Sequence, residues 1–104
     1  MANTMHLASQ LRATRALVKF ISDHKGEVDV DLAKCLGALE QKDVAAAARH
    51  ARNVKILGMG SITDWIPPVV FPHETSEYLF TELEALAHNW WRLIALSLEM
   101  QSET

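Results

Sequence analysis

The sequence predicts an all-α fold, a four-helix up-down bundle that forms a single helical domain over residues 1–104. Three observations lead to this prediction. Apolar residues recur at steps of three and four along most of the chain, which is the period of an amphipathic helix. Capping residues and short polar connections separate these stretches. The composition, 49% hydrophobic and 22% charged over 104 residues, is that of a globular domain large enough to bury one core.

The first helix is expected from about Thr4 to His24, because its apolar residues make one stripe. That stripe consists of Leu7, Leu11, Leu17 or Val18, and Ile21. Gly26 stands where a left-handed residue commonly ends a helix. His24 falls in the last turn, where a positive charge suits the helix dipole.

A helical hairpin is predicted next. Asp29 or Asp31 can cap the second helix, which runs to about Gln41 with Leu32, Leu36 and Leu39 on its inner face. Asp43 can cap a third helix from Val44 to about Ile56. Because the connection between them is short, the two helices should lie antiparallel.

The fourth helix is expected from about Glu74 to Met100, with Thr75 or Ser76 as its cap. Two neighbouring apolar stripes follow its length. One contains Leu79, Leu83, Leu86, Trp90, Ile94 and Ser97, and the other contains Phe80, Ala87, Trp91 and Leu98. A face this wide indicates either the central helix of the bundle or a helix that also meets another chain, as in a homodimer.

The connection between the third and fourth helices, residues 57–73, is unusual. It contains Gly58, Gly60 and all three prolines, which oppose regular helix. Between them lie apolar residues: Met59, Ile62, Trp65, Ile66, Val69, Val70 and Phe71. So long and apolar a connection should be ordered, and should either pack on the bundle or carry function. The run Gly58-Met59-Gly60-Ser61 could bind an anion through its backbone amides or could be a tight structural path, and both readings stay open.

Charge divides the chain into two halves. Residues 1–55 hold nine Lys or Arg against six Asp or Glu, whereas residues 56–104 hold only Arg92 against seven acids. Either the halves pair within the fold, or the second presents an acidic face to a basic partner. Nucleic acid is a poor candidate partner for an acidic chain.

The compartment expected from the sequence is the cytoplasm. We find no stretch of about 20 apolar residues that could span a membrane. The first twenty residues lack the apolar core and cleavage site of a signal peptide. Cys35 is the only cysteine, so no intrachain disulfide can form.

Neither catalysis nor a metal or other cofactor is expected. The histidines are His6, His24, His50, His73 and His88. The pair Glu84 and His88, four residues apart, is the best local spacing, but a zinc site needs three or four converging ligands. Cys35 lacks a basic neighbour on its own helix face, and Ser61 lacks the elbow motif of serine hydrolases.

Trp90, Trp91 and Arg92 form a distinctive cluster. Adjacent residues of a helix point about 100° apart, so both tryptophans can be buried only if two sides of the helix are covered. Core packing of both is favoured. Tryptophan and arginine are also enriched at interaction hot spots, so a partner surface is the alternative.

The run Gly58-Met59-Gly60-Ser61-Ile62-Thr63-Asp64, after a leucine- and alanine-rich hairpin, resembles a family of small bacterial helical domains with a G-M-G-S-x-[N/T]-D signature. The resemblance covers roughly residues 36–64, and this chain departs from it after Asp64, at Trp65-Ile66-Pro67-Pro68. Some members resemble proteins encoded near contact-dependent toxins, where small acidic helical proteins act as immunity proteins. The resemblance therefore implies a binding role without naming a partner.

Two function hypotheses follow. The first is a non-catalytic protein–protein interaction module, most concretely an immunity protein or antitoxin that binds and neutralises a cognate toxin. Its candidate partner-binding residues are Asp64, Trp65, Glu74, Glu77, Glu84, Trp91 and Arg92. The alternative is a small-ligand-binding or enzymatic bundle with a pocket near Trp65, His73 and His88. A homodimer is compatible with both.

Overall fold

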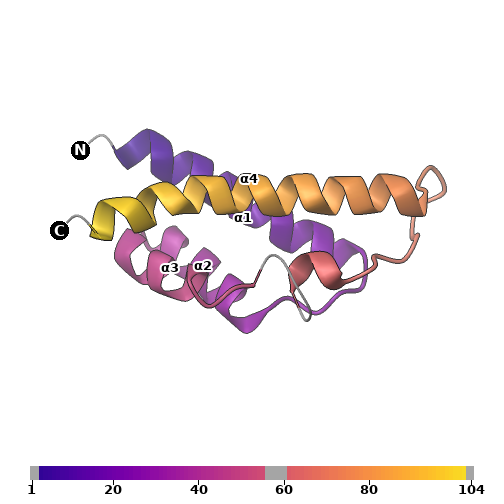
Figure 1. Ribbon diagram of the computed structural model, residues 1–104, viewed down its shortest axis with the longest axis horizontal. Helices are drawn as coiled ribbons and strands as arrows, with labels where there is room; N and C mark the ends of the chain where they lie inside the picture. The colour runs from indigo at the N-terminus through magenta and orange to yellow at the C-terminus, as the bar shows by residue number, and fades with distance from the viewer. Residues whose placement is uncertain (1–2, 56–60, 103–104) are drawn as a thin grey trace.

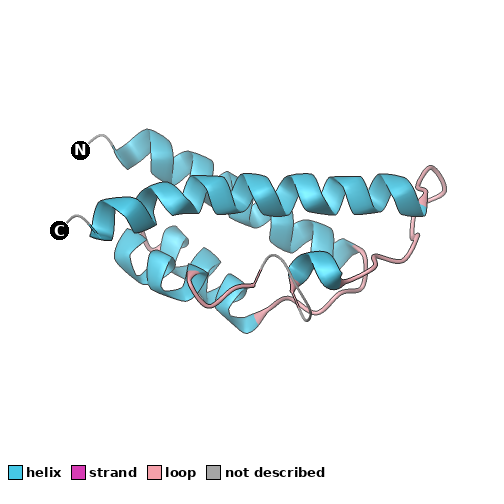
Figure 2. Ribbon diagram, in the orientation of Figure 1, coloured by secondary structure: helices cyan, strands magenta, loops and turns pink. Residues whose placement is uncertain are grey.

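The computed structural model describes residues 3–55 and 61–102, and in these residues it contains four α-helices, one 3-10 turn and no strand (Figure 2). The helices are α1 (Asn3–Asp23), α2 (Val30–Glu40), α3 (Val44–Ala51) and α4 (Ser76–Ser102), with the turn η1 (Ile62–Asp64) before α4. The all-α prediction is confirmed. Side chains are described for residues 7–55 and 61–94.

The helices form two layers. α1 and α4 lie against each other in opposite directions, and the α2–α3 hairpin and η1 lie below them in the view of Figure 1. α1 also packs on α2, and α4 also packs on α3 and η1. The Cα radius of gyration is 13.9 Å, near the value of about 13 Å typical of a 100-residue domain.

The core lies between the two layers and draws on every helix. Its largest fully buried side chains are Trp90, Leu17, Leu32, Leu39, Leu79, Leu83 and Ile94. On α4 the stripe of Leu79, Leu83, Trp90 and Ile94 is buried as predicted. The prediction that both adjacent tryptophans are core residues is right for Trp90 and wrong for Trp91, which is 39% exposed. Trp91 points about 100° away from Trp90, onto a flank that the layer below leaves open.

Local capping fixes the start of each helix that the sequence marked with a capping residue. The Asp29 carboxylate accepts hydrogen bonds from the amides of Asp31 (2.8 Å) and Leu32 (3.2 Å) at the start of α2. The Asp43 carboxylate accepts from Ala46 N–H (3.0 Å) at the start of α3. At α4 the cap is the Thr75 hydroxyl, which accepts from the amide of Tyr78 at 3.1 Å.

Two helix ends share a left-handed capping motif, which the sequence suggested only for the first helix and at Gly26. After α1, Gly26 N–H donates to Ile21 O (2.8 Å) and Lys25 N–H donates to Ser22 O (3.2 Å). This is the Schellman pattern, and its left-handed residue is Lys25 (φ 63°) rather than the expected Gly26. α2 ends in the same way around Lys42 (φ 62°).

Position 26 requires glycine because a side chain there would clash, and not because of its backbone conformation. A Cβ atom built on it would lie 2.8 Å from Ile21 Cγ2 and 2.8 Å from Trp65 Cζ2. The missing side chain therefore lets the end of α1 approach Trp65. This contact attaches the residues that follow η1 to the end of α1.

The third helix is shorter than predicted. It ends at Ala51 rather than near Ile56, because residues 52–53 form a turn in which Asn53 N–H donates to His50 O and Val54 N–H donates to Ala51 O. Gly58, Met59 and Gly60 lie outside the described residues, and with them all of the possible anion cradle except Ser61. Ser61, just after them, is buried.

Candidate functional site

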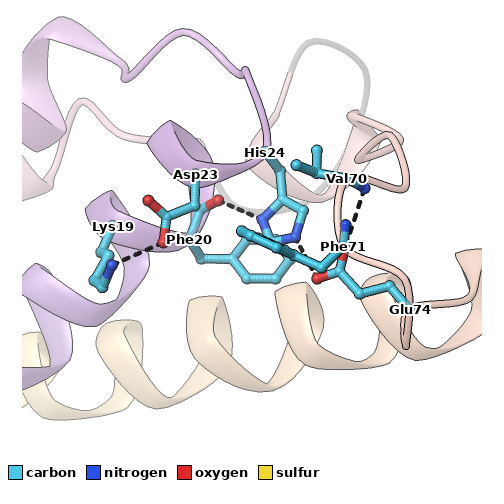
Figure 3. Close-up of polar contacts among 7 residues, drawn as sticks. All are labelled: Lys19, Phe20, Asp23, His24, Val70, Phe71 and Glu74. Atoms are coloured by element: carbon cyan, nitrogen blue, oxygen red, sulfur yellow. Dashed lines mark hydrogen bonds and ion pairs between the residues drawn. The ribbon is translucent and has the colours of Figure 1, made fainter.

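The most distinctive polar feature of the described chain is a buried ion pair between the end of α1 and the segment before α4. His24 Nε2 lies 2.7 Å from Glu74 Oε2, and the two side chains are only 6% and 5% exposed. The other ring nitrogen, Nδ1, lies 2.8 Å from the Phe20 carbonyl oxygen. Figure 3 shows the imidazole held between these two acceptors.

This geometry determines the protonation state of His24. A carbonyl oxygen and a carboxylate are both acceptors, so both ring nitrogens must carry a hydrogen for both contacts to be hydrogen bonds. Burial by itself lowers the pKa of His24, but the bonds to Glu74 and Phe20 and the nearby charges of Glu74 and Asp23 raise it, and the net result is a raised pKa. Below the ordinary histidine pKa of 6.5 the pair is therefore an imidazolium and a carboxylate.

Glu74 also organises the backbone before it. Its second oxygen, Oε1, accepts hydrogen bonds from the amides of Val70 (3.1 Å) and Phe71 (3.0 Å) (Figure 3). Desolvation raises the pKa of Glu74, but these amides and His24 outweigh it and lower the pKa to about 2. One carboxylate thus joins α1 to residues 70–71.

Aromatic contacts reinforce this junction. The Phe71 ring meets the His24 ring edge to face, with centroids 5.8 Å apart, and His73 stacks on Phe71 at 6.2 Å. The Phe20 ring lies 4.3 Å from the His24 ring and meets Trp65 edge to face at 6.5 Å. Both ends of the intervening backbone are therefore attached to the core.

Between these attachments lies the apolar segment 66–71. Pro67 is buried, but the large apolar side chains are exposed: Ile66 by 78%, Val69 by 51%, Phe71 by 42% and Val70 by 36%. An isolated exposed apolar residue is ordinary, whereas four within six residues on a fixed backbone form a candidate contact surface.

Two shallow hollows continue from the His24–Glu74 pair along α4. The first, about 280 Å³, lies between α1 and α4. The second, about 460 Å³, lies further along α4. They share Tyr78, Glu82 and Leu86. A hydrogen bond to Glu82 raises the pKa of Tyr78. The lining of both hollows is mainly apolar, and Glu82 is the carboxylate that they share.

A separate cleft of about 650 Å³ lies beside Trp65. Its walls come from the α1–α2 connection, from Lys55 and from residues 61–65. This is within the volume range of small-ligand sites, about 300–1,000 Å³. Neither His73 nor His88 lines it, so the pocket expected near Trp65, His73 and His88 does not contain the two histidines.

The structure places the predicted partner-binding residues in different surroundings. Exposed residues among them are Asp64, Glu77, Trp91 and Arg92, and half-buried ones are Trp65 and Glu84. The Glu74 carboxylate is buried against His24, so this residue shapes the surface from within and does not offer its charge to a partner.

Burial explains why the thiol of Cys35 is not a candidate nucleophile. Cys35 is fully buried, and desolvation raises the pKa of its thiol to about 12. Within residues 3–55 and 61–102, no three His, Cys, Asp or Glu side chains group as a metal site would require. No helix in the same residues has the length and apolarity to cross a membrane.

Sequence reasoning missed the partner of His24. It placed His24 at a helix end and Glu74 in the first turn of another helix, yet these residues are 50 positions apart and meet in space. A histidine ending an apolar stripe was the one available sign that its ring faces inward.

Comparison with known proteins found no match: no family model, no curated protein and no solved structure is similar to this chain.

Proposed function

We propose that this chain is a non-catalytic protein–protein interaction module that docks a partner on the apolar segment 66–71. The observation that supports this proposal is the combination of exposure and order. Ile66, Val69 and Phe71 face solvent, while Glu74 fixes the backbone amides of Val70 and Phe71. A surface held in its binding conformation loses less entropy on association.

Charge supports a basic partner. No lysine or arginine occurs from Ile56 to Trp91, and Asp64 and Glu77 are exposed on either side of the apolar segment. Acidic side chains around an apolar centre speed the encounter with a basic surface. Trp91 and Arg92, both exposed on α4, are further proposed contacts.

The concrete form of the proposal is an immunity protein or antitoxin that binds and neutralises a cognate toxin in the cytoplasm of a bacterium. The resemblance of residues 58–64 to the G-M-G-S-x-[N/T]-D family supports this version. The framework is the proposed four-helix up-down bundle, on which the Gly/Pro-rich connection is an ordered platform for the toxin.

The test is whether this chain neutralises the product of the gene next to its own. The two proteins are co-expressed in bacteria, growth is followed, and the dissociation constant of their complex is measured. The double variant Ile66→Asp/Val69→Asp should weaken binding by at least about 100-fold, since losing two apolar hot-spot contacts costs several kcal/mol. The matched control is Val30→Asp, which changes another exposed valine, on α2. Equal protection of growth by the double variant and the control would contradict the proposal.

A second copy of the chain is the alternative occupant of this surface. Light scattering after size exclusion separates the cases. A dimer that Ile66→Asp/Val69→Asp converts to a monomer would assign the segment to self-association.

The cleft beside Trp65 favours a second candidate function, the binding of a small ligand. Its lining combines Trp65 and Ile62 with two lysines and two acids, Lys25, Lys55, Glu27 and Asp29, which suits a small polar molecule with an apolar face. Mass spectrometry of the supernatant after heat denaturation would detect a ligand that copurifies. Its loss in a Lys25→Glu/Lys55→Glu variant would place the ligand in this cleft.

A further inference from the structure

The His24–Glu74 pair has a property that a purely structural contact would not need. Both nitrogens of one imidazole face acceptors, the Phe20 carbonyl at 2.8 Å and the Glu74 carboxylate at 2.7 Å. A neutral imidazole has one N–H, so it can satisfy only one of them. Loss of a single proton therefore leaves two lone pairs facing each other inside the protein, which is costly where water is excluded.

We propose that the His24–Glu74 pair is a pH-sensitive latch that holds the apolar segment 66–71 in its docking conformation while His24 is doubly protonated, and releases it when His24 becomes neutral. Glu74 transmits the change, because the same carboxylate that accepts from His24 accepts from Val70 N–H and Phe71 N–H. When the carboxylate leaves the imidazole, these two amides lose their fixed acceptor.

The charged and titratable groups around the pair come from three elements. From α1, Asp23 faces His24 and is itself bonded to Lys19 at 2.8 Å. From the connecting segment, His73 lies behind the Phe71 ring. From α4, Tyr78 and Glu82 line the hollow beside the pair. The negative charge of Asp23 favours the imidazolium.

The direction of the switch follows from linkage. Folding raises the His24 pKa above 6.5, so the folded latch binds its proton more tightly than the open one. The closed state is fully favoured below pH 6.5 and weakens as the pH rises through the folded pKa. For each unit by which folding raises that pKa, the equilibrium constant for opening should be about tenfold larger above the folded pKa than it is below pH 6.5.

The consequence for a partner rests on the proposed function, but opening of the latch does not. If segment 66–71 docks a protein, affinity should fall as the pH rises. If the partner binds elsewhere, the latch still opens with unchanged affinity, so the two ideas can fail separately.

The experiment is amide hydrogen exchange on the full chain without partner, followed by NMR from pH 5.5 to 9. Rates are converted to protection factors so that the intrinsic pH dependence of exchange is removed. Protection of the Val70 and Phe71 amides should fall at least about tenfold across the His24 titration, for a pKa raised by one unit or more. Protection of the Leu39 amide in α2 should not follow that titration. The His24 ring nitrogens report the pKa directly.

Three variants separate a latch from a merely structural contact. His24→Gln, which cannot titrate, should remove the pH dependence at Val70 and Phe71. Glu74→Gln, which keeps an acceptor for the two amides, should move the His24 pKa and the opening transition to lower pH. His88→Gln, an exposed histidine on α4, should leave the transition in place.

Two results would overturn the proposal. One is protection of Val70 and Phe71 that stays constant from pH 5.5 to 9 while His24 titrates. The other is the same pH-dependent loss of protection in His24→Gln as in the parent. Should His24→Gln fail to fold, an unmoved transition in Glu74→Gln decides against the latch in the same way.

Discussion

The α2–α3 hairpin and residues 61–75 are held in place by different means. The hairpin depends on neighbours in sequence: the Asp29 and Asp43 caps and the left-handed Lys42 that turns one helix into the next. Residues 61–75 depend on partners far along the chain, with Glu74 on His24 and Trp65 against Gly26. The segment with little regular structure is therefore the one whose order depends on long-range contacts and on charge.

The same comparison separates scaffold from surface. Of the described residues in the hairpin, 30–51, only Val30 is a large apolar side chain that is markedly exposed. The apolar segment 66–71 has four. This contrast between an apolar core in one region and exposed apolar side chains in the other is why segment 66–71 is the proposed docking surface.

The largest expected effect is on the pH dependence of stability. The His24–Glu74 pair contributes fully above the ordinary Glu pKa of 4.5 and below the ordinary His pKa of 6.5. Toward low pH its contribution is lost as Glu74 titrates down to about 2. Toward high pH it is lost as His24 deprotonates. Urea denaturation from pH 3 to 9 should therefore show a maximum of unfolding free energy between these values.

Variants of the pair should lose stability and change this profile. Glu74→Ala leaves a buried imidazole without its acceptor, so it should lower the unfolding free energy more than any glycine or cap substitution described below. His24→Gln should remove the decline above pH 6.5. A decline of the same size in His24→Gln would assign it to other groups.

The next effect concerns two glycines. Gly26→Ala places a methyl group 2.8 Å from Ile21 and Trp65 atoms, and such overpacking costs about 1–3 kcal/mol. Gly37→Ala, in α2, meets no atom within 4 Å and should stabilise by about 0.5–1 kcal/mol through helix propensity. Chemical denaturation of both variants measures the contrast. A neutral Gly26→Ala would show that Trp65 moves aside without cost, so that residues 61–75 are softer than the hairpin.

Helix caps are the third test. Asp29→Ala and Asp43→Ala each remove a side-chain acceptor from a first turn and should cost about 1 kcal/mol. The loss at Asp29 should be the larger, because its carboxylate accepts from two amides and that of Asp43 from one. Both variants should keep the parent's pH profile between pH 5 and 9, since neither touches the His24–Glu74 pair. A changed profile would mean that the hairpin and the pair are coupled.

The features that the sequence predicts are those that depend on local contacts, and the features that it does not predict depend on long-range ones. The Asp43 cap, the contact between α2 and α3 and the buried face of α4 depend on residues a few positions apart, so spacing alone indicated them. The exposure of Trp91 could not be predicted, because it depends on how far the lower layer extends across α4. The His24–Glu74 pair could not be predicted either, because no local pattern relates residues 50 positions apart.

The smallest effect tests whether the two helix ends are equivalent. Lys25 and Lys42 both have left-handed backbones, at φ 63° and 62°, where glycine avoids the steric cost of a Cβ atom. Glycine also gives the unfolded chain more freedom, so each Lys→Gly substitution should raise the free energy of unfolding by only about 0.5–1 kcal/mol. Lys42 joins two helices locally, whereas Lys25 follows the histidine of the ion pair. Equal gains in thermal denaturation at pH 6 would show that the α1 terminus is set by its own backbone motif. A smaller gain for Lys25→Gly would show that the His24–Glu74 pair already imposes this conformation, so that long-range contacts reach into the helix end itself.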